Sequence, residues 1–581
     1  MNYVLWVFVA WIAFAANASA QLSTAPRDAG SFDTLAICTP QLKLTLQRWI
    51  EYRQAQGRKI LLLDSRRFAR DNHALIRLTV GRHPTIEHLV LVGDAGDWRA
   101  KPTELLPTDF VLATVNVNFG SEFDIASDNT YGDLNDDGTP ELAVGRIAVT
   151  NATELDQYID RVIAYEGGAE DDVKDGALPD QSWKRRINLV AGIGGFGQVT
   201  DTLIENTTRK IITDKIPGGF QTSMTQASWR SPYCPDPRDF SKTAVERLNE
   251  GCMFWVYLGH GDRQKLDMLR VPKHPDQVKR RFEILDSEAV KGLHCRHGSP
   301  IALFLACYAG AIDSSQDCLA EQMIKQPAGP IAVIAGSRVT MPYAMSLLAM
   351  EMSNEYFDGQ CTTVGQLLMQ AKQKMTATTD ADDADPYRQM IETMGQTLSP
   401  LPKMLAQEKT EHLHMINLLG DPLLQLQRPE RVVVESVAIQ DDGVSEERTV
   451  SVSGVSPFAG SLVAELVYRR DRFRTRLKRR RKFKPDDTSL SAYQQQYEQV
   501  HDLVCSVRHT VVTQGAFKIN LDVPADVRGD CRVRLMLSGE FGSESDHENE
   551  SRFAIGSMDV DVPQINSTDR AARSAALIRQ K

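Results

Sequence analysis

Short apolar runs alternate with longer amphipathic stretches through roughly the first three quarters of the chain. Runs rich in Leu, Val and Ile predict buried strands, and stretches with apolar residues three or four positions apart predict helices. In a first unit, residues 32–38, 59–64 and 88–94 are expected strands, and residues 41–56 and 152–166 are expected helices. Strands that alternate with helices at this spacing imply a mainly parallel sheet with helices on both faces.

A second α/β unit is expected after the polar stretch 167–180. Its expected strands are residues 186–191, the apolar runs that start at Phe254 and Ile301, and residues 330–335. Its expected helices are residues 199–214, 282–293, 318–326, 343–357, 363–375 and 386–394.

The pattern of apolar and polar residues changes after about residue 429. Short runs rich in β-branched residues, separated by turn residues, replace the alternation of strands and helices. This pattern is typical of an all-β sandwich of immunoglobulin type. We therefore expect two α/β subdomains at 21–170 and 171–428, a β-sandwich at 429–565 and a disordered tail at 566–581. The expected β-strands are residues 432–439, 449–452, 461–468, 503–513, 516–523 and 533–538.

The first twenty residues read as a secretory signal. Val4 begins an almost unbroken apolar run that ends at Ala16, and Ala18-Ser19-Ala20 fits a cleavage site before Gln21. No Lys or Arg precedes the run, so an uncleaved membrane anchor is the alternative, although the apolar run is short for a spanning helix. The sequence thus predicts a secreted, cell-surface or periplasmic protein.

The composition excludes some classes of protein. The chain has 581 residues, 42% of them hydrophobic and 24% charged, as in globular proteins, and its net charge of −10 argues against a dedicated nucleic-acid binder. Nine cysteines are too few for a disulfide scaffold, and an odd number leaves at least one free thiol in an exported protein. Cys505 and Cys531, both in the β-rich region, could pair if the geometry allows it.

Two of the apolar runs end at reactive side chains. One leads into Gly259-His260-Gly261, and the other leads into Ala306-Cys307. Because parallel strands deliver their carboxyl ends to one edge of a sheet, we expect His260 and Cys307 to meet there. A cysteine with a histidine base is the nucleophile of a cysteine peptidase, and the N–H groups of Gly261 and Cys307 are expected to bind the oxyanion. A buried structural cysteine beside an unrelated histidine is the alternative.

Two nearby motifs compete with this interpretation. His297-Gly298 is a second His-Gly pair, but it follows a polar turn rather than an apolar strand. Residues 192–197 match G-x-G-x-x-G, yet the acidic residue that a dinucleotide site needs at the end of the next strand is absent. We therefore expect the glycine-rich stretch to shape the catalytic edge rather than bind a cofactor.

The order of motifs resembles the gingipain-type family of cysteine peptidases, within the caspase-like clan. His260-Gly261 and Ala306-Cys307 match the two blocks that mark that clan, and the stretches 127–138, 143–147 and 417–422 resemble the gingipain branch. The resemblance implies two caspase-like α/β subdomains, the second of them catalytic, followed by an immunoglobulin-like domain. It also implies an acidic residue that assists the histidine, for which Asp201 and Asp262 are the candidates.

Residues 133–138 begin like a calcium loop. Asp133, Asn135 and Asp137 stand at positions 1, 3 and 5, and Gly138 supplies the sharp turn. Val144 occupies position 12 instead of Glu, so this is not an EF-hand, and Glu141 or another carboxylate would have to complete the shell. An acidic turn that binds nothing is the alternative, but gingipains contain calcium, and the resemblance therefore favours a structural calcium site.

The segment 469–484, from Arg469 to Lys484, holds eleven Lys or Arg residues and one Asp. Such a run is usually a solvated hairpin loop, and we expect it to be dispensable for chemistry. It could instead hold an exported protein on an anionic surface polymer.

The sequence predicts an exported cysteine endopeptidase that acts on proteins or peptides without an organic cofactor. A sorting transpeptidase of the same acyl-thioester chemistry and a surface-binding protein on an inactive peptidase scaffold are the alternatives.

Overall fold

A computed structural model describes most of the chain. The described residues are 31–67, 72–96, 104–167, 180–194, 210, 212–274, 280–295, 298–377, 385–441, 448–475, 477, 480–540 and 551–564. The predicted signal peptide, the tail 566–581, most of the expected helix 199–214, Asp201 and His297 lie outside them.

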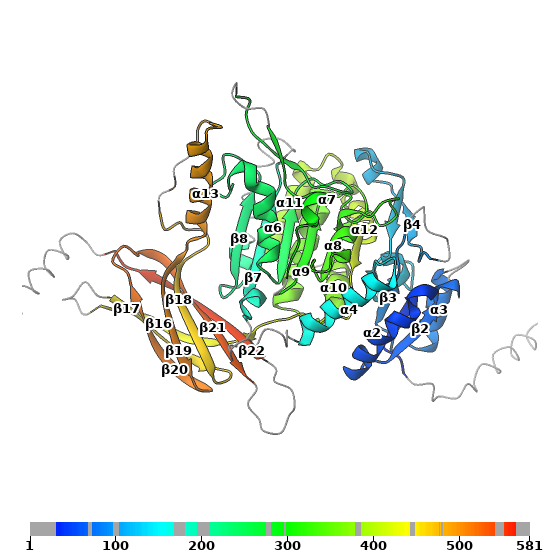
Figure 1. Ribbon diagram of the computed structural model, residues 1–581, viewed down its shortest axis with the longest axis horizontal. Helices are drawn as coiled ribbons and strands as arrows, with labels where there is room; N and C mark the ends of the chain where they lie inside the picture. Colours follow the sequence, from blue (N-terminus) through cyan, green and yellow to red (C-terminus); the bar gives the residue numbers. More distant parts are fainter. Residues whose placement is uncertain are drawn as a thin grey trace, which may run out of the picture.

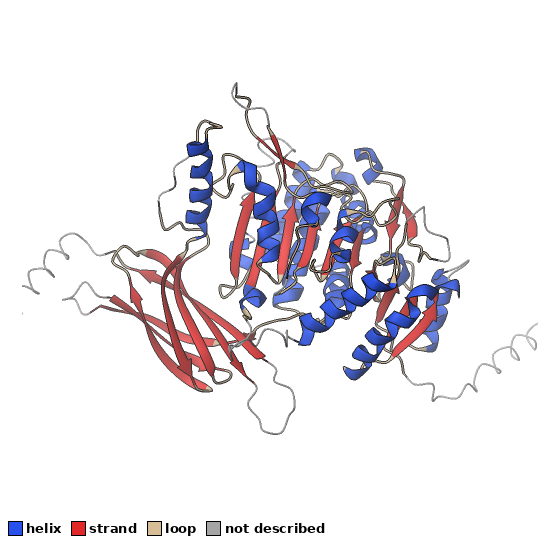
Figure 2. Ribbon diagram, viewed as in Figure 1, coloured by secondary structure: helices blue, strands red, loops and turns tan. Residues whose placement is uncertain are grey.

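A ten-stranded sheet forms the centre of the molecule (Figures 1 and 2). Its two halves are each parallel, as the α/β pattern predicts, but they run in opposite directions because β14 pairs antiparallel with β13. In spatial order the strands are β2 (Ile60–Asp64), β1 (Thr34–Cys38), β3 (His88–Val92), β6 (Ala143–Ile147), β14 (Ile416–Leu419), β13 (Ala332–Gly336), β12 (Ile301–Leu305), β9 (Phe254–Leu258), β7 (Arg186–Ala191) and β8 (Gln221–Gln226).

The expectation of a separate sheet for each subdomain is wrong. The late strand β14 lies between β6 and β13 and joins the two halves into one sheet. Its four residues are all buried and were recognised only as part of a motif, because so short an apolar run gives no strand periodicity of its own.

Helices cover both faces of the sheet, as Figure 2 shows. Their bounds are α2 (Lys43–Ala55), α3 (Asn72–Arg82), α4 (Ala152–Gly167), α6 (Phe240–Asn249), α7 (Ser287–Val290), α8 (Leu319–Lys325), α9 (Pro342–Phe357), α10 (Val364–Thr376), α11 (Pro386–Leu398) and α12 (Leu405–Met415).

The expected helix 282–293 is wrong. Its first residues form the strand β11 (Arg281–Glu283), which pairs antiparallel with β10 (Met268–Arg270), and only α7 is helical. Phe282 is buried between two more exposed charged neighbours, which is a strand alternation of period two. The helix starts late because Asp286 caps it by accepting a hydrogen bond from the Ala289 N–H at 2.9 Å.

The C-terminal region contains two mainly antiparallel sheets that share one hydrophobic core (Figure 1). Sequence analysis missed its last strand, β22. The larger sheet holds β15 (Glu430–Arg431), β22 (Ser551–Val562), β21 (Gly529–Glu540), β18 (Gly460–Tyr468) and β19 (Val504–Val512), and the smaller holds β16 (Val433–Asp441), β17 (Arg448–Ser456) and β20 (Gly515–Val523). A further antiparallel pair, β4 (Asp109–Leu112) and β5 (Asp124–Ser127), belongs to the N-terminal half.

An unexpected helix, α13 (Asp487–His501), stands beside the edge strand β8 (Figure 1). Its Tyr497 hydroxyl lies 2.7 Å from the hydroxyl of Thr225, and His501 accepts a hydrogen bond from the Met224 N–H at 3.1 Å. The β-rich region therefore docks directly on the catalytic half of the sheet.

The basic segment 469–484 is not simply a solvated loop, as we had expected. Arg470 donates to the carbonyl oxygens of Ile216 and Phe220 at 2.6 and 2.7 Å, and Arg480 donates to that of Ser231. Burial lowers the pKa of Arg470 to about 9. These internal hydrogen bonds could not be predicted, because the sequence does not show which residues of a basic run point toward the protein interior.

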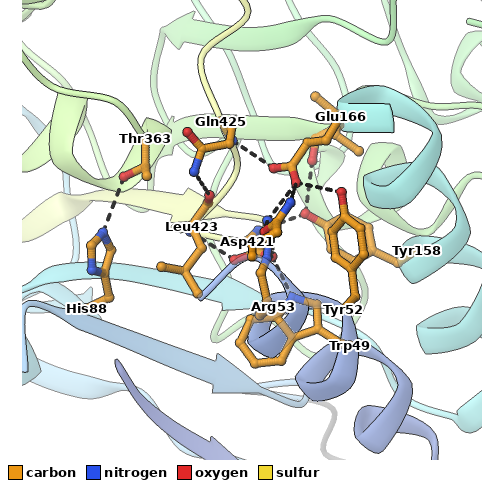
Figure 3. A network of polar contacts seen from close by, with 12 residues as sticks. Trp49, Tyr52, Arg53, His88, Tyr158, Glu166, Thr363, Asp421, Leu423 and Gln425 are labelled. Carbon is orange, nitrogen blue, oxygen red and sulfur yellow. Dashed lines mark hydrogen bonds and ion pairs between the residues drawn. The ribbon is translucent and has the colours of Figure 1, made fainter. Parts of the chain in front are cut away.

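A buried polar network joins the N-terminal half to the end of β14 (Figure 3). Asp421 accepts hydrogen bonds from Trp49 at 2.5 Å and from Arg53 at 2.6 Å, and its own N–H donates to the Tyr158 hydroxyl at 2.7 Å. Arg53 also contacts Glu166, at the end of α4, at 2.6 Å. The Gly-Asp-Pro part of the 417–422 motif thus has a structural role.

All nine cysteines are free thiols in this structure, but the Cys505 and Cys531 thiols contact one another, so the disulfide considered above stays a prediction. None of the described helices is long and apolar enough to cross a membrane.

Candidate active site

The predicted pair lies at the ends of adjacent parallel strands. Leu258 on β9 is paired with Leu305 on β12, and the same register, continued by two residues, sets His260 opposite Cys307. Both residues line one cavity of about 630 Å³. Paired residues on these two parallel strands are 47 positions apart in sequence, as Leu258 and Leu305 are. His260 and Cys307 have the same separation, so both follow their strands at the same carboxyl edge of the sheet.

Gly261 packs directly against the cysteine. A Cβ atom at this position would lie 2.6 Å from the Cys307 carbonyl oxygen, closer than real Cβ atoms approach. Only glycine therefore lets the chain after His260 pass this close to Cys307.

The Cys307 thiol is half-buried and faces Thr340. Its sulfur accepts a hydrogen bond from the Thr340 N–H at 3.3 Å and lies 3.7 Å from the Thr340 hydroxyl. The sulfur also lies 3.8 Å from the Thr340 carbonyl oxygen, so Thr340 fixes the position of the Cys307 side chain.

The backbone turns sharply after the cysteine. Tyr308 has a φ of 57°, an uncommon value for an aromatic residue, and its N–H donates to the Arg338 carbonyl oxygen at 3.1 Å. The Ala309 N–H closes the turn by donating to the Cys307 carbonyl oxygen at 2.7 Å. Strain of this kind persists where surrounding contacts hold it.

The residues that hold Tyr308 in this conformation, Glu122, Arg263 and Arg338, come from three different segments of the chain. The Tyr308 hydroxyl donates to Glu122 at 2.7 Å, and Arg263 pairs with Glu122 at 2.5 Å while its guanidinium lies 4.5 Å from the centre of the Tyr308 ring. Burial opposes ionisation of Glu122, but Tyr308 and Arg263 outweigh it and keep the pKa of that carboxyl below its ordinary value. Sequence analysis missed Glu122, because nothing local shows that the β4–β5 connection reaches the catalytic edge.

An aspartate whose backbone contacts that of His260 was also not predicted from the sequence. The N–H of Asp267 donates to the His260 carbonyl oxygen at 3.1 Å, and the Tyr257 hydroxyl donates to the same oxygen at 2.8 Å. One Asp267 carboxylate oxygen accepts from the Met268 N–H at 2.7 Å, and the other is buried without a hydrogen-bond partner in the described structure. By contrast, Asp262, one of the two expected candidates, is exposed and bonded to the Arg263 N–H.

The described part of the glycine-rich stretch, residues 192–194, lies at the same edge, as expected. A Cβ at either Gly192 or Gly259 would lie 2.6 Å from the Tyr257 hydroxyl, and the Gly192 N–H donates to the Leu258 carbonyl oxygen at 2.8 Å. The competing histidine, His297, is outside the described residues. Gly298, the next residue, accepts a hydrogen bond from the Cys252 N–H just before β9 begins, so Gly298 is at the opposite edge of the sheet.

The acidic loop brings its expected ligands together. Carboxylate oxygens of Asp133, Asp137 and Glu141 lie within 4.8 Å of one another. Burial and the neighbouring carboxylates raise the pKa of Glu141, as expected where negative charges crowd together. Asn135 belongs to the same cluster, because its side-chain NH₂ donates to the carboxylates of Glu141 at 2.9 Å and Asp137 at 3.1 Å, while its side-chain oxygen accepts from the Asp137 N–H. These oxygens are of the type that calcium prefers.

Comparison with known families identifies the chain. The family model described as peptidase family C25 matches residues 27–427. The chain belongs to peptidase family C25. It is therefore a cysteine-type peptidase of the gingipain family, and its substrates are proteins or peptides. This confirms the resemblance inferred from the motifs.

Two solved structures are similar to this C25 peptidase. The Arg-specific cysteine proteinase gingipain R is 14% identical, with a TM-score of 0.50, over 92% of this chain and 99% of that chain. A complex of the pro- and mature domains of a gingipain R from Porphyromonas gingivalis is also 14% identical, with a TM-score of 0.49, over 90% of this chain and 99% of that one. At this identity the first match supports the fold. Comparison with curated protein sequences found no match.

Proposed function

We propose that this C25 peptidase cleaves peptide bonds with Cys307 as nucleophile and His260 as general base and acid. His260 takes the thiol proton, and the sulfur adds to the scissile carbonyl carbon. The N–H groups of Gly261 and Cys307 stabilise the oxyanion. His260 then protonates the amine as the C–N bond breaks, and water, deprotonated by His260, hydrolyses the thioester. The observation that carries the proposal is the strand register that sets His260 opposite Cys307 at one cavity.

Asp267 is our candidate for the group that orients His260, in place of Asp201 and Asp262. Its backbone contact with His260 and its buried, unbonded carboxylate oxygen support this role. A carboxylate in such a position favours the imidazolium that forms during the reaction.

We also propose a structural calcium ion at Asp133, Asn135, Asp137 and Glu141. The three clustered carboxylates support it, because their mutual repulsion is relieved by a divalent cation. Such an ion would fix the loop between β5 and β6, far along the chain from Cys307.

Export and surface attachment remain proposals from the sequence. Residues 1–20 support a signal peptide, and the exposed Arg481, Lys482 and Lys484 support retention on an anionic polymer even though Arg470 and Arg480 are committed to internal contacts. The two packed sheets after residue 429 support an immunoglobulin-like domain.

The decisive experiment compares cysteine variants with similar exposure. Cys307 and Cys505 are the two half-buried thiols, whereas the other seven are buried. Cys307→Ala should reduce peptide hydrolysis to background, Cys505→Ala should leave it unchanged, and iodoacetamide should modify Cys307 more slowly in His260→Ala. Substantial turnover by Cys307→Ala would refute the assignment. Product analysis with an added amine would reveal transpeptidation.

A further inference from the structure

The cavity beside Cys307 extends along the sheet toward a second, apolar space. This inner space has a volume of about 180 Å³ and lies between strands β7, β9 and β12 and helix α9. Leu258, Leu305 and Ser346 belong to the walls of both spaces. The inner walls are almost wholly aliphatic or aromatic and include Val256, Leu303, Ala349, Met350 and Phe357.

The catalytic pair and this inner space are on the same face of the sheet. Side chains on a strand alternate between faces, so Leu303, Leu305 and Cys307 follow one another on one side. Val256, Leu258 and His260 do the same on the neighbouring strand, and the leucines and Val256 line the inner space. When a substrate carbonyl lies over the Cys307 sulfur, the side chain of that residue enters this cavity.

The charge of the cavity opposes a basic side chain. Among its described lining residues none is Asp or Glu, whereas Arg230 and Arg470 both contribute. His501 lines it as well, and burial lowers the pKa of this histidine to about 4, so it is neutral. An ammonium or guanidinium group entering here would lose water and meet the positive charges of Arg230 and Arg470. An apolar side chain would instead lose only its contact with water.

We propose that this peptidase cleaves after large apolar residues (Leu, Met, Phe or Tyr) and discriminates against Lys and Arg. The inference rests on the proposed roles of Cys307 and His260. The β-rich region takes part, because Val500 and Leu503 form one wall of the cavity. The specificity pocket is therefore shared between the α/β sheet and the C-terminal region.

The first test measures kcat/KM on peptides that differ only in the residue before the scissile bond. Leu, Met, Phe or Tyr should be cleaved at least about 100-fold faster than Lys or Arg, which is about 2.7 kcal/mol at 1.36 kcal/mol per tenfold change. Chloromethyl ketones of Phe and Arg peptides, followed by mass spectrometry of Cys307, provide a second readout. Faster cleavage or labelling with Arg or Lys would overturn the inference while the catalytic assignment stands. If neither reagent labels Cys307, the proposed function falls and the inference with it.

A charge-introducing variant tests the pocket itself. Ser346 points from α9 toward both spaces and bonds only the Pro342 carbonyl oxygen, at 2.7 Å, so Ser346→Asp places a carboxylate in the wall. The ratio of apolar to Lys or Arg cleavage should fall at least tenfold. Leu44→Asp, at a position on α2 that is 90% exposed, is the matched control and should leave the ratio unchanged. A folded Ser346→Asp enzyme with the wild-type ratio would contradict the proposed pocket.

Discussion

Replacing Asp421 by Ala should destabilise the protein far more than removing a solvent-exposed ion pair on α2, the helix that carries its partner Arg53. Asp421 and Arg53 are both completely buried and lie 2.6 Å apart. The substitution leaves Arg53, the Trp49 indole N–H and the Leu423 N–H without this acceptor (Figure 3). Buried donors that lose their partners carry the full cost of desolvation.

The expected loss follows from these contacts. Breaking a buried ion pair by removing one partner costs about 3–5 kcal/mol. Arg53 keeps its contact with Glu166 at 2.6 Å, which favours the lower end of that range. We therefore expect a loss of about 3 kcal/mol, or on the order of 100-fold in the unfolding equilibrium constant, at 1.4 kcal/mol per tenfold change.

Arg48→Ala is the matched control. Arg48 also lies on α2 and pairs with Asp156 and Asp160 on α4, but its side chain is 45% exposed. Such surface pairs contribute about 0–1 kcal/mol because water and salt screen them.

The assay is urea denaturation at neutral pH, carried out in a Cys307→Ala background so that self-cleavage cannot contribute. The midpoint should fall strongly for Asp421→Ala and little for Arg48→Ala, with the slope unchanged. Asp421→Asn, which can still accept from Leu423, should fall between them. If Asp421→Ala and Arg48→Ala lose the same stability, the buried network does not join the two halves of the fold as we infer.

Three further predictions concern the site and its supports. Asp267→Asn should lower kcat about 10- to 100-fold and leave KM nearly unchanged, because a poorly oriented base slows proton transfer without altering substrate binding; an unchanged kcat would exclude the positioning role. Chelation should lower the thermal midpoint, since an ion bound only by the native state stabilises it, and Asp133→Ala should abolish that response; identical melting curves with calcium and with chelator would refute the site. Burial opposes ionisation of Glu465, but Arg534 and Arg185 outweigh it and lower its pKa. The stability it contributes should therefore be present at neutral pH and be lost progressively as the pH falls below about 4.5 through the lowered native pKa, so the difference between wild type and Glu465→Gln in denaturation should shrink with falling pH; a constant difference would contradict this linkage.

The sequence by itself determined the elements whose signal is local. Buried parallel strands are continuous apolar runs, so the strands that end near His260 and Cys307 could be predicted from the sequence. Because the carboxyl ends of parallel strands lie at one edge of the sheet, the two residues were expected there together. The acidic loop could also be recognised, because its acidic residues lie within nine positions of one another, and the structure gathers Asp133, Asp137 and Glu141; the calcium ion itself stays a proposal.

Only the tertiary structure decided which distant segments meet. The chain reverses direction between His260 and Asp267, which brings their backbones into contact. Glu122 contacts Tyr308 from a distant part of the chain. Helix α13 packs against β8, although its sequence does not indicate a partner. The short strand β14 joins the two halves into one sheet. The sequence did not predict this, because four buried residues show no periodicity and do not indicate which strands lie beside them. The reason is physical: strand and helix patterns report the burial of each element, whereas contacts between elements depend on how all of them pack together.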